Sequence, residues 1–239
     1  MREIYNKNID NENYIIEFDE EALEYKSKNP WLFSVFIKYD SFDESQQGYE
    51  EFLETKESLI IAIEYEGTAK YVGVRVVDGW SEFYFYTSVT KGFNSTVSAI
   101  LSPSKYIYES NIVRDTKWNF YETQLLPSEL ESHHIVSAKI AFLLAEEDDD
   151  TEVVREVEHY AVFDTDTQKD RFKDLAIEAG FEYKDDISTD EYEYGIALIK
   201  KHNIEDAEVK KVVEELYELI KKEHGYYEGW STTLVPKES

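Results

Sequence analysis

Residues 71–86 have the sequence YVGVRVVDGWSEFYFY, in which two runs of β-branched and aromatic residues flank the pair Asp78-Gly79. An Asp-Gly pair between such runs is a strong signal for a two-residue hairpin turn. The stretch therefore predicts two antiparallel strands, over 71–77 and 80–86.

The segments around this hairpin predict a β-α-β-β-α-β order in the first half of the chain. The expected strands lie at 31–37, 71–77, 80–86 and 117–125, and the expected helices at about 45–65 and 93–101. The helices are indicated by apolar residues at spacings of three and four, and the strands by aromatic and β-branched runs. This order suits a four-stranded antiparallel sheet with two helices on one face.

The second half predicts the same order again. Strands are expected at 159–163, from 181, at 192–198 and at 230–235, and helices at 172–179 and 209–220. Between the halves, Ser128 and Glu131 form a capping-box pattern that opens a connecting helix, and the carboxylates of 146–150 end it.

The predicted fold is therefore α+β, with two tandem ferredoxin-like β-α-β-β-α-β sandwiches. Each has a four-stranded antiparallel sheet with two helices on one face. The expected organisation is an N-terminal extension at 1–28, a first domain at 29–127, a connecting helix and acidic linker at 128–151, and a second domain at 152–239.

Charge limits the partners that the protein can bind. The 239 residues include 52 Asp and Glu but only 25 Lys and Arg, which gives a formal net charge of -27. Such a surface repels nucleic-acid phosphates and anionic lipids alike, so we expect no direct nucleic-acid or membrane binding. A partner with a basic surface fits best, and the alternative is that the acidity serves solubility.

Composition and the start of the chain also bear on where the protein acts. Cysteine is absent, the start of the chain lacks the apolar core of a signal peptide, and no apolar run approaches the ~20 residues of a membrane span. We therefore expect a cytoplasmic location.

Signatures of catalysis are missing from the sequence. It contains no nucleophile-elbow, dinucleotide-binding or phosphate-loop motif, and the five histidines lack the HExxH spacing of a metal site. Each histidine is expected to be a surface or capping residue. Exposed aromatics such as Tyr84, Tyr86 and Tyr121 suit an RNA platform only beside Lys or Arg, but their neighbours are acidic. We therefore predict neither an enzyme, nor a metal, nor a cofactor.

Motifs in the second half resemble the ribonuclease E inhibitor B family, also called regulator of ribonuclease activity B. They are Glu158-His159-Tyr160-Ala161-Val162-Phe163, Arg171-Phe172, Gly180-Phe181, Tyr194-Gly195 and Gly225-Tyr226-Tyr227-Glu228-Gly229-Trp230, where Glu228 replaces the family's Asp. The likeness covers roughly 152–236.

The first half resembles the domain of unknown function 695 family, which is often fused ahead of the inhibitor-like domain. The residues that carry this likeness are Pro30-Trp31, 79–86, 118–121 and Leu125-Leu126-Pro127. Most motif positions in both halves are also expected to have a structural role, as helix caps or core aromatics.

The resemblance implies a non-catalytic protein that binds an endoribonuclease and lowers its activity. Residues 152–239 carry 23 acidic and 12 basic residues, a net charge of -11, which suits competition with RNA for an Arg-rich segment of the nuclease. The expected partner-binding residues are Asp148, Asp149, Asp150, Asp185, Asp186, Asp190 and Glu191. The alternatives are an enzyme or a small-molecule-binding protein with its site in a cleft between the domains.

Overall fold

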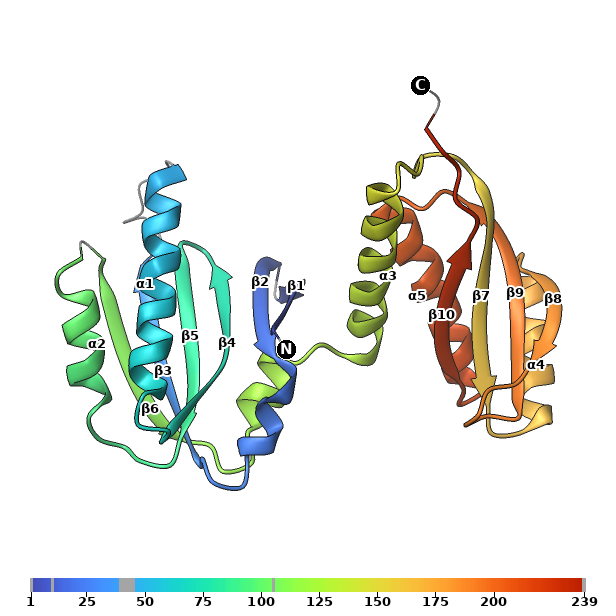
Figure 1. Ribbon diagram of the computed structural model, residues 1–239. Helices are drawn as coiled ribbons and strands as arrows, with labels where there is room; N and C mark the ends of the chain where they lie inside the picture. Colours follow the sequence, from blue (N-terminus) through green and yellow to red (C-terminus); the bar gives the residue numbers. More distant parts are fainter. Residues whose placement is uncertain (1, 10, 39–45, 105, 238–239) are drawn as a thin grey trace. The chain divides into compact units, whose positions relative to one another are not determined.

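The computed structural model describes residues 2–9, 11–38, 46–104 and 106–237 (Figure 1). The chain divides into two compact units, Met1–Leu126 and Pro127–Ser239. The first unit contains a six-stranded sheet and the second a four-stranded sheet, and all strand pairs are antiparallel. The predicted α+β class is confirmed.

The first unit has the sheet order β1-β2-β4-β5-β3-β6. Its elements are β1 (Arg2–Ile9), β2 (Glu12–Asp19), the 3-10 helix η1 (Glu20–Tyr25), β3 (Trp31–Lys38), α1 (Gln46–Glu64), β4 (Ala69–Val77), β5 (Trp80–Thr87), α2 (Phe93–Leu101), β6 (Tyr108–Arg114) and the π-helix η3 (Tyr121–Leu125). The predicted hairpin is β4–β5, and Asp78 and Gly79 both adopt the positive φ values that its tight turn requires. The expected helix start at residue 45 lies outside the described residues.

Both faces of the first sheet are covered. Helices α1 and α2 cover one face, as Figure 1 shows, and the apolar side chains of β3, β4 and β5 pack beneath them. The opposite face packs against the segment that follows β6. Trp118, Tyr121 and Leu125 from this segment are fully buried.

The predicted strand at 117–125 is wrong, because residues 119–125 are helical and residues 117–118 lie just before this helix. Asp115 begins the helix: its carboxylate oxygens accept hydrogen bonds from the backbone N–H groups of Asn119 and Phe120, each at 3.0 Å. The fourth strand of the expected order is β6, which lies earlier in the chain and pairs with β3.

Residues 1–28, expected as an extension, contribute secondary structure to the first unit. Strands β1 and β2 form a hairpin, and β2 pairs with β4 at the side of the sheet. Tyr5 of β1 is buried, and its hydroxyl donates a hydrogen bond to the carbonyl of Leu125 at 3.1 Å.

The second unit has the sheet order β10-β7-β9-β8. Its elements are α3 (Glu129–Glu146), β7 (Arg155–Phe163), α4 (Asp166–Glu178), β8 (Glu182–Ile187), β9 (Tyr194–His202), α5 (Asp206–Lys222) and β10 (Tyr226–Thr232). The Ser128–Glu131 capping box that opens α3 is confirmed. The last strand starts earlier than predicted, directly after the turn at Gly225.

The core of the second unit lies between the sheet and two helices. Phe172 and Ala176 of α4 and the apolar stripe of α5 pack onto alternate residues of β7 and β9. Helix α3 packs against α5 and β10, and the indole N–H of Trp230 donates to the Ser137 hydroxyl at 3.1 Å.

Both units place their strands in the same spatial order. The four strands of the first β-α-β-β-α-β run lie in the order β4-β5-β3-β6, and those of the second run lie in the order β8-β9-β7-β10. In both runs, therefore, the first strand in the chain lies between the third and the fourth, and the second strand lies beside the third. Within the described ranges, no helix has both the length and the apolar character that a transmembrane helix needs.

Candidate functional site

The predicted surface residues Asp148, Asp149 and Asp150 lie in the turn after α3, where they differ in exposure. Asp148 is exposed and Asp150 is half-buried, but Asp149 is fully buried. The two carboxylate oxygens of Asp149 accept hydrogen bonds from the Arg155 guanidinium at 2.7 and 2.8 Å. The charge of Asp149 is therefore not available to a partner, which corrects its assignment to an accessible acidic surface.

Arg155 and Asp149 tie three segments of the second unit together. The Arg155 guanidinium also donates to the carbonyls of Asp150, Val153 and Thr233. Asp149 additionally accepts the backbone N–H of Val235 at 2.7 Å. These bonds join the turn after α3, the start of β7 and the segment beyond β10, so the pair has a structural role.

The other predicted residues lie together in the β8–β9 hairpin. Asp185 and Asp186 are in β8, Asp190 and Glu191 are in the loop that follows, and all four are exposed. Asp186 accepts a hydrogen bond from Lys169 of α4 at 2.8 Å. The hairpin also contains Glu182 and Glu193, both exposed, which the prediction left out although they continue the same acidic run.

The core of the second unit contains a buried chain of polar side chains. His159 and His202 are only 1% and 4% exposed, so the expectation that they are surface or capping residues is wrong. The Tyr227 hydroxyl lies 2.9 Å from His159 Nδ1, and the Nε2 atoms of the two histidines lie 3.1 Å apart. His202 Nδ1 lies 2.6 Å from the Asn203 carbonyl.

These contacts allow one arrangement of protons in the neutral chain. A carbonyl can only accept, so His202 Nδ1 carries the hydrogen and its Nε2 is an acceptor. His159 Nε2 must then donate to His202, and His159 Nδ1 accepts the Tyr227 hydroxyl proton. Burial lowers the pKa of His159 to about 3, with the charges of His202 and Lys200 acting in the same direction.

This buried chain makes the second unit sensitive to acid. In the unfolded chain His159 binds a proton near the ordinary pKa of 6.5, whereas in the folded unit the His159 ring stays neutral until about pH 3. The free energy of unfolding therefore falls as the pH drops below about 6.5, and His159 alone lowers it by about 2 kcal/mol between pH 7.5 and 5. Burial also lowers the pKa values of His133, His134 and His202, which adds a loss of the same sign.

Urea unfolding of the full chain at several pH values measures this effect. All five histidines lie in the second unit, so the first unit is an internal control in which no histidine contributes. In His159→Leu we expect the free energy of unfolding of the second unit to change less steeply with pH. The variant should be less stable than the unmodified protein at every pH. An unchanged slope in this variant would contradict the assignment.

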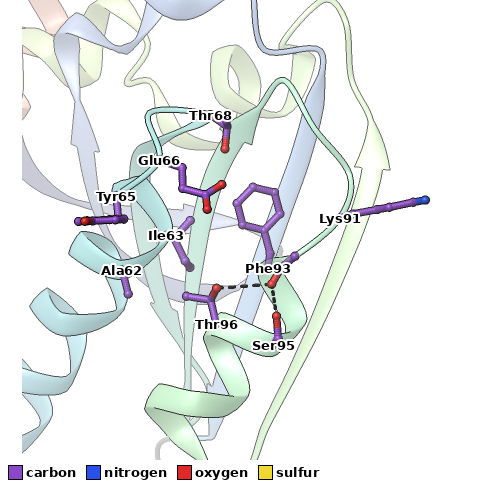
Figure 2. A pocket seen from close by; sticks show the side chains of 10 residues that line it. Ala62, Ile63, Tyr65, Glu66, Thr68, Lys91, Phe93, Ser95 and Thr96 are labelled. Atoms are coloured by element: carbon purple, nitrogen blue, oxygen red, sulfur yellow. Dashed lines mark hydrogen bonds between the residues drawn. The ribbon is translucent and has the colours of Figure 1, made fainter.

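The first unit contains a cavity of about 270 Å³ between the end of α1 and the start of α2 (Figure 2). Tyr65, Glu66 and Thr68 lie on one side and Lys91 and Phe93 on the other. The hydroxyls of Ser95 and Thr96 donate hydrogen bonds to the carbonyl of Gly92, the residue before α2. In the described parts of the chain, no group of three or more His, Cys, Asp or Glu is placed to hold a metal ion.

The aromatic residues considered for an RNA platform are inside the first unit. Tyr84, Tyr86 and Tyr121 are all at most 2% exposed. The Tyr86 hydroxyl donates to Asp115 at 2.6 Å, and the Tyr84 hydroxyl donates to Glu82 at 2.7 Å. These rings are therefore not available to stack on bases.

The motif at 225–230 has a structural explanation at several positions. A side chain at Gly225 would meet the Phe163 ring at 2.3 Å, and Gly229 adopts a φ of +120° where β10 bulges. Tyr227 binds His159, and Trp230 binds Ser137. The motif thus fixes β10 against β7 and α3.

Comparisons with known proteins confirm both resemblances. The family model described as "Family of unknown function (DUF695)" matches residues 3–126, and the one described as "Regulator of ribonuclease activity B" matches residues 134–232. The search of curated proteins found no match. A crystal structure of an unknown protein from Galdieria sulphuraria is similar over 82% of this chain and 92% of that chain, with 8% sequence identity and a TM-score of 0.21. A region that matches regulator of ribonuclease activity B follows the DUF695 region. Since the DUF695 model matches more than half of the 239 residues, the chain belongs to the DUF695 family.

Proposed function

We propose that this chain is a non-catalytic regulator that binds an endoribonuclease of the ribonuclease E type and lowers its activity. The observation that carries the proposal is the match of residues 134–232 to regulator of ribonuclease activity B. The region matched covers β7 to β10 and the helices α4 and α5. In this proposal both units are ferredoxin-like sandwiches, and the protein acts in the cytoplasm without a cofactor.

The proposed contact is electrostatic and is made by the second unit. Residues 152–239 have a net charge of -11, and the β8–β9 hairpin contributes six exposed carboxylates to it. A nuclease binds RNA through Lys and Arg, so its RNA-binding surface is complementary to this hairpin. The protein would then compete with RNA for the same cations.

Neutralising this hairpin tests the proposal. In Asp185→Asn/Asp190→Asn/Glu191→Gln, we expect the concentration needed for half-inhibition of RNA cleavage to rise about tenfold, because charges at an interface steer and hold a basic partner. The salt dependence of binding should also become shallower. Cleavage rates at increasing concentrations of each protein, at low and moderate salt, give both quantities.

Helix α4 provides a matched control for these charge changes. Asp170, Asp174 and Glu178 are exposed on α4, and Asp170→Asn/Asp174→Asn/Glu178→Gln removes three carboxylates from the same unit, as many as the hairpin variant does. Inhibition should change little in this variant. Equal losses in both variants would mean that overall charge, rather than the hairpin, determines binding, and no inhibition by the unmodified protein would reject the function itself.

A further inference from the structure

Strand β8 is an open edge of the second sheet. It is the last strand in the order β10-β7-β9-β8, and among the described residues only β9 pairs with it. Residues 182–186 of this strand are all exposed. An edge strand of this kind presents backbone N–H and C=O groups that can pair with another extended chain.

Residues of α4 and β9 contact strand β8 and hold it in place. The Lys169 ammonium, whose side chain is only 8% exposed, bonds Asp186 at 2.8 Å and Asp166 at 3.0 Å. Lys173 lies 3.7 Å from the centre of the Tyr183 ring. Gly195 of β9 permits close packing of β8, because a side chain at Gly195 would meet Ile187 of β8 at 2.7 Å. These contacts hold β8 against α4 and β9, and the register of its pairing with β9 shifts between Tyr183 and Asp185.

One backbone donor of this edge is bonded to a side chain. The Asp186 N–H donates to the Asp185 carboxylate at 2.9 Å. A carbonyl of an incoming strand can take the place of that carboxylate. The Asp185 carboxylate would then be free to bind a Lys or Arg side chain of the incoming strand. Backbone pairing and charge pairing would therefore reinforce one another.

The charge of the edge determines which chain fits it. Residues 182–193 contain six carboxylates and one cation, Lys184, which is already paired with Glu158. Among these carboxylates, Asp186 has an ion pair, and Glu182, Asp185, Asp190, Glu191 and Glu193 have none with a described residue. This charge opposes pairing with a second copy of the same edge and favours a basic strand.

We propose that β8 binds an extended, Lys- and Arg-rich segment of the partner as a fifth strand of the second sheet. This inference rests on the proposed function, since it specifies how the acidic hairpin holds its partner. Backbone hydrogen bonds would supply a fixed orientation, and the carboxylates would select basic side chains.

Backbone methylation of a basic peptide tests the inference on the unmodified full chain. The probe is a peptide of about ten residues in which arginine and threonine alternate. Two analogues carry N-methyl groups, one on every arginine and the other on every threonine, so all three peptides have the same charge. In a β-strand alternate N–H groups face the same neighbour, so one analogue loses its bonds to β8 and the other keeps them.

We expect one analogue to bind at least about tenfold more weakly than the unmodified peptide, while the other retains most of its affinity. The amides of 182–187 should exchange more slowly with solvent when the unmodified peptide is bound. Equal affinities for both analogues, or no protection of β8, would overturn the inference. If the nuclease is inhibited without protection of β8, strand addition is wrong but the proposed function stands. If the peptide binds β8 and the nuclease is not inhibited, the function fails and strand addition stands.

Discussion

Replacing Arg155 with methionine is expected to lower the free energy of unfolding of the second unit by about 3–5 kcal/mol. The side chains of Arg155 and Asp149 are 5% and 0% exposed, and their atoms approach to 2.7 Å. Methionine leaves the Asp149 carboxylate buried without its counter-charge. Removing one partner of a buried ion pair costs more stability than replacing both partners with apolar residues. Hydrogen exchange of β7 and β9 amides during urea unfolding measures the second unit separately from the first.

Two further variants separate the buried charge from general effects of losing an arginine. Arg171→Met removes an exposed guanidinium that lies 3.8 Å from Glu223, and surface changes of this kind alter stability by less than about 1 kcal/mol. Asp149→Asn/Arg155→Met removes both charges, keeps an acceptor for the Val235 N–H, and should recover at least half of the loss. A double variant as unstable as Arg155→Met would show that an unpaired charge is not the cause.

The local turn chemistry of the chain could be predicted from the sequence. The Asp78-Gly79 turn and the Ser128–Glu131 capping box depend on residues that are close in the chain, and both are present in the structure. The apolar stripe of α5 is equally local, since Val209, Val212 and Leu216 are all buried.

The segment at 117–125 shows where local patterns were insufficient. Its aromatic residues suit a strand, but Trp118, Tyr121 and Leu125 also lie at helical spacings of three and four, and all three are buried on the sheet. The choice is made by Asp115, which binds the first helical N–H groups, and by partners far away in sequence such as Tyr86 and Asn29.

The burial of Asp149, His159 and His202 could not be predicted from the sequence either. Asp149 stands between two other aspartates and looks like part of a solvated run, and only the fold brings Arg155 and Val235 to it. His159 and His202 are 43 residues apart in the chain, and pairing of β7 with β9 brings them into contact. Single-residue patterns contain no information on such long-range partners.

Replacing Trp118 with alanine is the change expected to cost most in the first unit, about 3–5 kcal/mol. The indole is fully buried, stacks on the Tyr86 ring with centres 3.9 Å apart, and contacts Tyr121 edge-on. Its N–H donates to the Asn29 carbonyl at 2.8 Å. Alanine therefore leaves both a cavity and a buried carbonyl without a partner.

The matched comparison uses a second tryptophan of the same unit. Trp80 begins β5 beside the turn and is only partly buried, so Trp80→Ala should cost less than half as much. Trp118→Phe keeps an aromatic ring on Tyr86 but loses the bond to Asn29, and about 1–2 kcal/mol is expected for it. Hydrogen exchange of β3 and β5 amides in urea measures all three. If Trp118→Ala matched Trp80→Ala, the helical segment would not contribute to the stability of the sheet, and its cover of the second face would be incidental.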